Sequence, residues 1–559
     1  MIERHVRVMK IVLLLSSVAS ILILAATAYQ EHFRAEWRDI QAEYREALIR
    51  TAGNDDARMA ASAYRIEFKQ AFLEGLGGVD RCVSCHLGVE NPAMSDADQP
   101  LRRHSGKWLV NHPTDSFGCT ICHGGEGRAT RKEAAHGWRE NDSPAPNVAT
   151  PLLRGDAVYT SCGRCHYEVD LYAGQSDLYA YSFGAGFVEI KKPQIDESIL
   201  TFRLAGADVL AEGKRLVVEN GCLGCHRYRG GGGDLGADLT HVGDKTKHDF
   251  DFTHVKGEHT ARQWHYEHFL RPGAISPGTV MPNMDFTPDE AQSLALYMTS
   301  LRRKSAPATH TPRPLVTTLA NAAPASGETL YKMFCCACHG ESGRGDGPAA
   351  KTIKGNPRDF WHERFRYVST QNGVPTQEDL VKTISTGRRF GEMPANPQLT
   401  ESEVLAVAEY IRSLNRAGWV ERLTAAFADD DDIDSEEIEE IAEARVTPRR
   451  IIIVPWPGES FEPDTEVGRT LFLENCASCH GPEGRGDGPQ ELVDERGRKI
   501  RARDLSSGDF RGGEELDEIY KRIRAGMPGT PMPAQASLSD DEIWQLVHYV
   551  HSIAGNQPG

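Results

Sequence analysis

The sequence has no excess of positive charge. It contains 63 Lys and Arg residues and 80 Asp and Glu residues, which gives a net charge of −17 at pH 7. Nucleic acids are bound by basic surfaces, so this balance argues against nucleic acid as a partner, whereas an acidic surface suits docking to basic proteins. The chain also lacks a P-loop, a dinucleotide-binding glycine fingerprint and a recognisable Ser-His-Asp set. A second, nucleotide-dependent or hydrolytic activity therefore has no support, and no catalytic residue is predicted.

Long apolar runs are scarce as well, in a chain of 559 residues that is 40% hydrophobic. One such run, residues 11–29, carries no charge and follows Arg7 and Lys10. Its length and basic flank predict a transmembrane anchor over residues 1–30, with the bulk of the chain in the bacterial periplasm. A cleaved signal peptide is the alternative, because small residues stand at Ala26 and Ala28. Either interpretation places the remaining sequence outside the cytoplasmic membrane.

Cysteine is almost absent outside one pattern. Of the 13 cysteines, twelve form six Cys-x-x-Cys pairs, each followed directly by a histidine. Chance would produce roughly 0.01 such pentapeptides in this chain. The pairs are Cys82/Cys85, Cys119/Cys122, Cys162/Cys165, Cys222/Cys225, Cys335/Cys338 and Cys476/Cys479, and the histidines are His86, His123, His166, His226, His339 and His480.

This pentapeptide predicts covalent haem attachment. Two thiols on one helical turn can add to the two vinyl groups of a haem, and the next imidazole then reaches the iron as proximal ligand. A zinc site would need cysteine pairs grouped by fours and no following His. A redox pair would not recur six times, and disulfides have no use for the histidine. We therefore expect six haem c groups, each with its iron. The extra Cys336 is expected to be a small buried hydrophobe, with a reactive thiol or a transient disulfide as the alternative.

The first three motifs lie within residues 81–198, too close together for three separate cores. This segment predicts a compact triheme module in which cofactors replace much of the apolar interior. Apart from the proximal ligands it holds three histidines, His104, His112 and His136. Three spare imidazoles for three irons favour bis-His ligation, with Met94 as a weaker substitute. Which histidine serves which haem does not follow from the sequence.

Three repeats follow, at residues 205–303, 327–416 and 466–556. Each starts with a short helix running into Cys-x-x-Cys-His, continues to a Met-Pro pair, and closes with an amphipathic helix that contains a tyrosine. Thr or Ser followed three residues later by Glu predicts a capping box at the start of each closing helix. Together with the anchor, this pattern predicts a mainly α fold.

Each repeat resembles a class I cytochrome c domain. The resemblance implies a glycine at the crossing of the two helices, a tyrosine packed against it, and a methionine as distal iron ligand. The positions that match are Gly213, Gly327 and Gly468; Tyr297, Tyr410 and Tyr549; and Met281, Met393 and Met532, with Met284 and Met527 as rivals for two of the sulfurs. The first repeat departs from the pattern with an insert of six histidines, which are expected to lie in a solvated loop: His241, His248, His254, His259, His265 and His268.

The remaining segments are connections. Residues 31–80 read as a helical stalk, 304–326 as a linker rich in Pro, Ala and Thr, and 417–465 as an acidic linker that acts as a solvated tether or steers a basic carrier protein. Two stretches, VDRCVSCHLGVENP at 79–92 and HPTDSFGCTICHGGEGRAT at 112–130, carry a further resemblance. Through them, residues up to about 200 resemble membrane-anchored multihaem cytochromes that accompany bacterial quinol-oxidising complexes. The resemblances together cover most of residues 80–556.

These features predict an electron carrier or an electron-transfer subunit rather than an enzyme. Bis-His haems are lower in potential than His/Met haems, because thioether sulfur favours ferrous iron. Electrons would then run from a quinol-oxidising membrane complex, through the triheme module, to a cytochrome, oxidase or reductase. One alternative is a haem enzyme of the peroxidase or nitrogen-oxide reductase type with one open iron. Another is a subunit whose haem domains mainly bridge an assembly.

Overall fold

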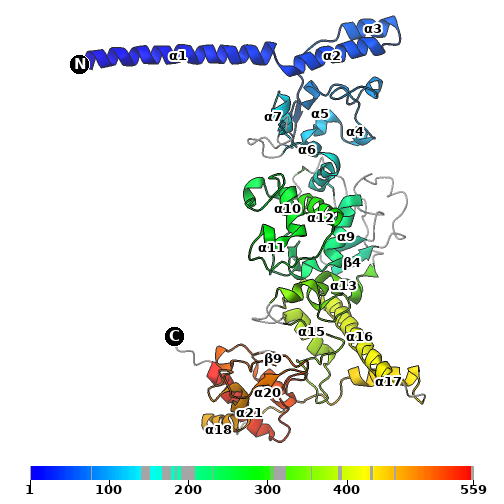
Figure 1. Ribbon diagram of the computed structural model, residues 1–559, viewed down its shortest axis with the longest axis vertical. Helices are drawn as coiled ribbons and strands as arrows, with labels where there is room; N and C mark the ends of the chain where they lie inside the picture. The colour runs from blue at the N-terminus through cyan, green and yellow to red at the C-terminus, as the bar shows by residue number, and fades with distance from the viewer. Residues whose placement is uncertain are drawn as a thin grey trace. The chain divides into compact units, whose positions relative to one another are not determined.

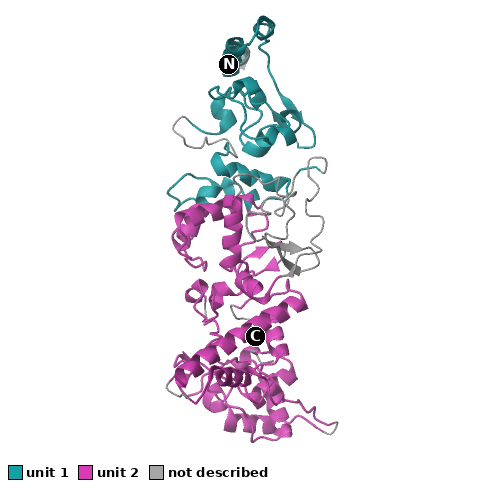
Figure 2. Cartoon of the chain, turned by 90° about the vertical axis from the view of Figure 1, so that its right-hand side faces the viewer, with its two compact units in different colours: residues 1–168, 243–264, 302–314 teal, residues 169–242, 265–301, 315–559 magenta. Residues whose placement is uncertain are grey.

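The computed structural model of the chain is mainly helical, as expected, and divides into two units (Figure 2). Unit 1 comprises residues 1–168, 243–264 and 302–314, and unit 2 the rest. The structure describes residues 2–76, 78–139, 151–166, 178–182, 186–190, 208–229, 231–303, 306–307, 323–353, 356–387, 393–428, 432–458, 461–510 and 512–554. Parts of the predicted triheme segment and most of the linker at 304–326 therefore lie outside the described residues.

Unit 1 begins with a single long helix, α1 (Ile2–Phe33), drawn in dark blue in Figure 1. Its stretch His5–Gln30 has a mean hydropathy of 2.5 and is long and apolar enough to cross a membrane, a test that a signal sequence also passes. The hydroxyls of Ser16, Ser20 and Thr27 donate to carbonyls one turn earlier, at 2.8–2.9 Å. Their polar groups are thereby satisfied within the helix, as an apolar surrounding requires.

The segment predicted as a stalk holds two helices, α2 (Glu36–Thr51) and α3 (Asp55–Ser62). Helix α2 packs onto the first haem motif through a buried Gln41. Its amide donates to the carbonyls of Glu67 (2.8 Å) and Ser84 (3.1 Å) and accepts from the Glu67 N–H (2.9 Å). Because a buried amide must be fully bonded, these contacts fix α2 against the haem-binding segment.

The haem-binding part of unit 1 is built from short elements. They are β1 (Ala71–Leu73), β2 (Gly78–Asp80), η1 (Cys82–Ser84), η2 (Pro92–Met94), α4 (Trp108–Asn111), α5 (Thr114–Phe117), α6 (Thr120–His123), α7 (Lys132–His136) and η3 (Gly155–Arg164). Strands β1 and β2 pair as an antiparallel hairpin. Among the described residues here few apolar side chains are buried: a small cluster around Tyr44, Met94 and Leu101, and outside it Leu73 and Ala157. So few apolar side chains are typical of a segment organised around cofactors.

Unit 2 contains a small antiparallel sheet in the order β3 (Leu178–Ser182), β4 (Gly186–Ile190), β7 (Ala323–Pro324). Two further short hairpins are β5 (Arg227–Tyr228) with β6 (Gly231–Gly232), and β8 (Leu492–Val493) with β9 (Lys499–Ile500). Strand β7 comes from the end of the segment predicted to be a linker, so that segment ends in an ordered strand.

The three repeats share one helical plan (Figure 1). Repeat 1 has α9 (Asp208–Glu219), η6 (Cys222–Gly224), α10 (Ala261–Leu270), α11 (Pro272–Ile275) and α12 (Pro288–Ser300). Repeat 2 has α13 (Gly327–Phe334), α14 (Cys336–His339), α15 (Gln377–Thr386) and α16 (Glu401–Ala426). Repeat 3 has α18 (Thr465–Asn475), α19 (Ala477–His480), α20 (Leu516–Ala525) and α21 (Asp540–Ala554).

The first and last helices of each repeat cross at a glycine. A Cβ added at Gly213 would lie 2.6 Å from the Cβ of Tyr297, and one at Gly468 would lie 2.7 Å from that of Tyr549. In repeat 2 a Cβ at Gly327 would clash with the carbonyl oxygen of Ala406. The backbones therefore touch in all three repeats, which only glycine permits. The structure thus brings each predicted glycine to the predicted crossing.

The capping boxes predicted for the closing helices are confirmed. At α12 the Glu290 N–H donates to the Thr287 hydroxyl (3.3 Å) and the Thr287 N–H donates to the Glu290 carboxylate (2.8 Å). Helix α16 is capped in the same way by Thr400 and Glu403, and α21 by Ser539 and Glu542. Each box satisfies two backbone donors that a helix start would otherwise leave unpaired.

The acidic linker predicted at 417–465 is more ordered than a tether. Helix α16 runs on to Ala426, and a further helix, α17 (Ser435–Val446), packs against it. Ala442 and Val446 are buried, while Arg416 on α16 forms ion pairs with Glu439 and Glu443. The tether interpretation was wrong for these residues, because an apolar stripe and a basic partner hold the acidic helix in place.

Replacing Gly468 with Ala is expected to destabilise repeat 3 by about 2–3 kcal/mol, the usual cost of overpacking. The new methyl group would stand 2.6 Å from the Gln545 carbonyl oxygen, and the gain in helix propensity is smaller. Hydrogen exchange measured by mass spectrometry on peptides of α18 and α21 reports the opening free energy of this repeat. The matched control is Gly458→Ala, whose added Cβ meets nothing within 4 Å. Equal exchange in both variants would contradict the close crossing.

Candidate haem sites

All six Cys-x-x-Cys-His motifs adopt the same helical turn. In each, the histidine N–H donates to the carbonyl of the first cysteine, at 2.8–2.9 Å. This bond closes one helical turn, which contains both cysteines and the histidine of the motif. None of the thirteen cysteines forms a disulfide bond, which leaves each pair available for thioether bonds. The local backbone is therefore compatible with haem attachment at every motif.

The structure gives Cys479, in the sixth motif, a bonding partner that the sequence prediction did not provide. Its thiol donates to the side-chain oxygen of Gln490 (3.2 Å), and the Ser478 hydroxyl lies 3.8 Å from the same sulfur. The predicted thioether would carry no hydrogen and could only accept. The bond to Gln490 uses the proton of the thiol. Addition to a haem vinyl group would remove that proton and release Gln490, so attachment at Cys479 stays a prediction.

The proximal imidazoles of the repeats are oriented by backbone carbonyls. Nδ1 of His226 donates to the carbonyl of Ala237 (2.8 Å), that of His339 to Arg358 (2.9 Å), and that of His480 to Arg503 (3.0 Å). Donation from Nδ1 fixes the tautomer in which Nε2 carries the free lone pair. Burial lowers the pKa of all three imidazoles. The neutral form that binds a metal is thus favoured.

In unit 1 the three remaining histidines each face one proximal histidine. In every pair the two ring centres are 6.1 Å apart: His86 with His136, His104 with His123, and His112 with His166. Two iron–nitrogen bonds of roughly 2 Å, plus roughly 1.1 Å from each nitrogen to its ring centre, span about 6 Å. Each pair therefore leaves the space that one iron between two imidazoles requires.

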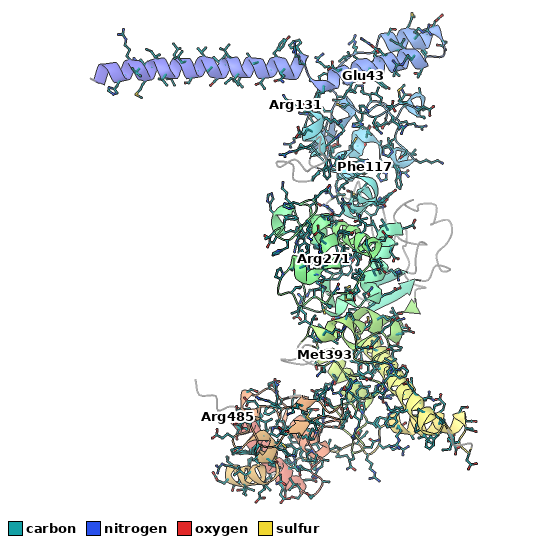
Figure 3. All side chains as sticks on the ribbon, viewed as in Figure 1. Glu43, Phe117, Arg131, Arg271, Met393 and Arg485 are labelled. Atoms are coloured by element: carbon teal, nitrogen blue, oxygen red, sulfur yellow. The ribbon has the colours of Figure 1, made fainter. Side chains whose placement is uncertain are left out.

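Second contacts orient the distal rings as well. Nδ1 of His104 donates to the Ser105 carbonyl (2.8 Å) and Nδ1 of His112 to the Trp108 carbonyl (3.0 Å). Phe117, labelled in Figure 3, packs edge-on against His112 with ring centres 5.1 Å apart. In the neutral form of both imidazoles the lone pair that can bind a metal is therefore on Nε2.

Electrostatics in the triheme segment favour neutral ligands. Burial lowers the pKa of His86, and positive charge on His136 and His123 would add to the effect. Burial likewise lowers the pKa of His123, followed by the influence of His104. Met94, the alternative ligand, lies in the small apolar cluster with an exposed fraction of 1%. Its position is that of a core side chain.

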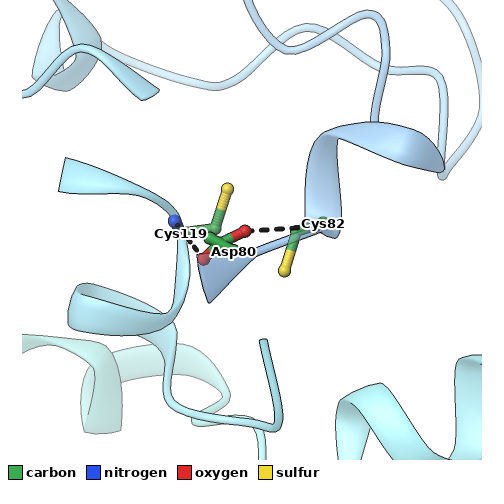
Figure 4. A group of neighbouring side chains, drawn as sticks. All are labelled: Asp80, Cys82 and Cys119. Atoms are coloured by element: carbon green, nitrogen blue, oxygen red, sulfur yellow. Dashed lines mark hydrogen bonds between the residues drawn. The ribbon is translucent and has the colours of Figure 1, made fainter. Parts of the chain in front are cut away.

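The first two motifs are joined by Asp80, a residue that the sequence analysis did not single out (Figure 4). One carboxylate oxygen accepts from the Cys82 N–H (3.0 Å), and the other from the N–H groups of Cys119 and Thr120 (2.8 Å each) and from the Thr120 hydroxyl (3.0 Å). The available signal was its place two residues before Cys82, where Asp commonly bonds the backbone. These four donors engage both oxygens of the carboxylate.

Burial alone would raise the pKa of Asp80, but hydrogen bonds, the backbone bond from Thr120 first among them, hold it below the usual carboxyl range. The carboxylate is therefore ionised whenever the segment is folded near neutral pH. Its bonds bring the thiols of Cys82 and Cys119 together: the ligand atoms of the three residues lie within 4.8 Å of one another. Two cysteines that are predicted to attach different haems thus lie side by side.

A second such contact joins repeats 1 and 2. The side chains of Cys225 and Cys338 hydrogen-bond each other, and a Cβ at Gly224 would clash with the Phe334 carbonyl oxygen. Cys336, the extra cysteine, lies in the same contact. Its thiol donates to the carbonyls of Lys332 (2.9 Å) and Glu219 (3.4 Å), and its exposed fraction is 5%. It is the small buried residue expected, and it packs between two repeats.

The Met-Pro loops of repeats 2 and 3 pack in the same way. A Cβ at Gly387, the residue after α15, would lie 2.7 Å from the carbonyl oxygen of Met393, which Figure 3 labels. A Cβ at Gly526, the residue after α20, would lie 2.7 Å from that of Met532. Met527, the rival of Met532, uses its N–H to bond the Met532 carbonyl (3.1 Å). Met393 and Met532 therefore occupy equivalent positions in repeats 2 and 3, each against the glycine that ends the preceding helix.

The histidine-rich insert of repeat 1 is not a solvated loop throughout. Four of its histidines are exposed, namely His241, His248, His254 and His259. His265 and His268 lie on α10, where His265 is buried and His268 half-buried. Nε2 of His268 stands 3.1 Å from the sulfur of Met281, the expected distal ligand. Burial first, and then the charge of nearby His226, lower the pKa of His268 to about 4. The loop interpretation is wrong for these two residues, because a helix holds them inside.

Three stretches of the chain match the protein-family model described as Cytochrome c: residues 210–302, 324–415 and 465–554. These three segments are cytochrome c domains. The chain therefore carries three cytochrome c domains, and the repeats are cytochrome c domains 1, 2 and 3. The helix crossings, capping boxes and Met-Pro loops described above lie within the matched stretches.

Among curated proteins, the chain is distantly similar to cbb3-type cytochrome c oxidase subunits. The CcoP subunit of Azospirillum brasilense is 27% identical over 240 residues, which is 42% of this chain and 63% of the relative. The FixP subunit of Azorhizobium caulinodans is 25% identical over 248 residues, 43% of this chain and 62% of the relative. The chain thus spans somewhat less than two thirds of the length of these relatives. A solved structure, the Kuenenia stuttgartiensis reducing HAO-like protein complex Kustc0457/Kustc0458, matches with a TM-score of 0.34 and 33% identity, covering 41% of this chain and 94% of that chain.

Proposed function

We propose that this chain is a six-haem cytochrome that carries electrons on the periplasmic side of a bacterial cytoplasmic membrane, anchored there by α1. A bound c-type haem supplies one-electron iron chemistry. The protein's part is to hold each iron between two fixed ligands and to keep neighbouring cofactors close. The observation that carries this proposal is the set of three imidazole pairs at 6.1 Å.

We assign the ligands of the triheme module from these pairs. The haems attached at Cys82, Cys119 and Cys162 would have their irons held by His86 with His136, His123 with His104, and His166 with His112. Two strong ligands on every iron leave no position for a substrate. This arrangement supports electron transfer over a haem enzyme with an open iron. In the cytochrome c domains the distal ligands are Met281, Met393 and Met532, as the family resemblance implies.

Neighbouring thiols support a continuous path within each unit. Cys82 adjoins Cys119, and the thiol of Cys122 lies close enough to that of Cys165 for their charges to interact. In unit 2, the side chains of Cys225 and Cys338 are hydrogen-bonded to each other. Because the adjacent thiols belong to different motifs, and each motif would attach one haem, adjacent thiols imply adjacent cofactors. Three successive haems in unit 1, and the first two of unit 2, are thereby placed for electron exchange.

The ligand types set a direction. Thioether sulfur raises the reduction potential relative to imidazole, so the triheme module is the low-potential end and the three domains are the high-potential end. Electrons entering from a quinol-oxidising membrane partner would leave toward a cytochrome, oxidase or reductase. The similarity to oxidase subunits supports a partner of that kind, and an acidic surface suits a basic carrier.

A potentiometric titration of the purified full chain tests this assignment. We expect two groups of potentials: three low-potential haems with bis-imidazole electron paramagnetic resonance signals, and three high-potential haems that carry the far-red methionine–ferric absorption band. The measurement follows both signals against the applied potential. If the methionine band titrates at lower potential than the bis-imidazole signals, the proposed direction of flow is wrong.

A further inference from the structure

One side chain sets the distal side of domain 1 apart from the ligand set proposed above. Nε2 of His268 lies 3.1 Å from the sulfur of Met281, well within hydrogen-bonding distance for sulfur. A thioether sulfur can only accept a hydrogen bond. Nε2 must therefore carry the proton in this contact. A neutral imidazole then has Nδ1 as an acceptor, and that atom faces the Ser276 hydroxyl at 3.4 Å.

The backbone around this contact is built to hold it. Ser276 follows the short helix α11, and its carbonyl accepts from the Thr279 N–H (3.1 Å). The Thr279 hydroxyl in turn accepts from the Met281 N–H (3.1 Å). One turn thus positions both the residue that faces Nδ1 of His268 and the methionine that faces Nε2. His268 itself is held by α10, next to the buried Phe269.

We propose that His268 is a positioning residue that donates a hydrogen bond from Nε2 to the iron-binding sulfur of Met281. This inference rests on Met281 being the distal ligand, as proposed above. One sulfur lone pair binds iron and a second accepts the hydrogen bond. The bond draws electron density from the sulfur and so favours ferrous over ferric iron.

The arrangement distinguishes domain 1 from domain 3. In domain 3 the same Thr-x-Met-Pro turn recurs, with the Met532 N–H donating to the Thr530 hydroxyl (3.3 Å). The histidine comes from the insert that only domain 1 carries in the sequence. The insert therefore gives the domain 1 haem a potential of its own, at the position where this domain adjoins domain 2 through Cys225 and Cys338.

The test compares His268→Phe with His268→Gln in the full-length protein. Phe removes the donor, whereas the Gln amide can still donate. We expect His268→Phe to lower the midpoint potential of one of the three methionine-ligated haems, with up to a tenfold fall in its ferrous-to-ferric ratio at fixed potential, equivalent to about 59 mV for one electron. His268→Gln should recover most of the shift. The far-red methionine band should keep its full intensity in both variants.

The controls separate the possible failures. His254→Phe, at an exposed position of the same insert, should leave all potentials unchanged. Potentials that are the same in His268→Phe and wild type would overturn the hydrogen bond. If His268→Phe instead gains one methionine band relative to wild type, His268 is itself the iron ligand, and the proposed hydrogen bond is wrong. Met281→Leu should remove one of the three bands; if all three remain, the ligand assignment itself fails, whatever His268 does.

Discussion

Replacing His104 with Ala is expected to open one haem to carbon monoxide. The reduced wild-type protein should bind none, because every iron has two protein ligands in the proposed assignment. In His104→Ala the iron next to His123 loses its sixth ligand, since the two rings face each other at 6.1 Å. The carbon monoxide difference spectrum of the dithionite-reduced full chain should then show binding at one haem per chain.

The same experiment tests the pairing residue by residue. His112→Ala and His136→Ala should each open a different haem, and a double variant should open two. Resonance Raman or magnetic resonance of the resulting adduct identifies which proximal histidine remains. His254→Ala, which removes an exposed imidazole, is the matched control and should bind no carbon monoxide. Binding by the reduced wild-type protein would show an open iron and favour the haem enzyme.

Much of the site could be predicted because its signals are local. A haem motif spans five residues, a capping box four, and a Met-Pro turn even fewer, so each is visible in the sequence without knowledge of the fold. The Gly213–Tyr297 crossing was accessible only through the family resemblance, because its two partners lie at opposite ends of the domain. Its geometric basis, a Cβ that would stand 2.6 Å from another, is visible only in the structure.

The histidine pairing could not be predicted, because the pairs do not follow the order of the residues along the chain. The first proximal ligand, His86, faces the last candidate, His136, while His123 faces His104, which precedes it. Short helices and loops, rather than a periodic pattern, set this arrangement. At the acidic linker the composition gave a wrong prediction, because its many carboxylates indicated a tether. Ile438, Ala442 and Val446 form one apolar stripe on a helix, and all three are buried.

Replacing Asp80 with Asn is expected to destabilise the triheme module by about 3 kcal/mol. The carboxylate is buried and accepts four hydrogen bonds, three of them from the backbones of two haem motifs. An amide replaces one acceptor oxygen with an N–H₂ group that faces existing donors. Buried donors left without a partner cost about 1–3 kcal/mol each. Hydrogen exchange at the N–H groups of Cys119 and Thr120 should therefore accelerate, while peptides of domain 3 should be unaffected.

The pH dependence gives this prediction a signature of its own. Because the folded state holds the pKa of Asp80 below the usual carboxyl range, its contribution is complete above the unfolded-state pKa and is lost as pH falls through the lower folded-state value. The difference in exchange between wild type and Asp80→Asn should thus be full at neutral pH and shrink in acid. Asp115→Asn, at an exposed carboxylate in the same segment, is the matched control. A difference that persists unchanged into strong acid would show that lost packing, rather than the ionised carboxylate, joins the first two haem motifs.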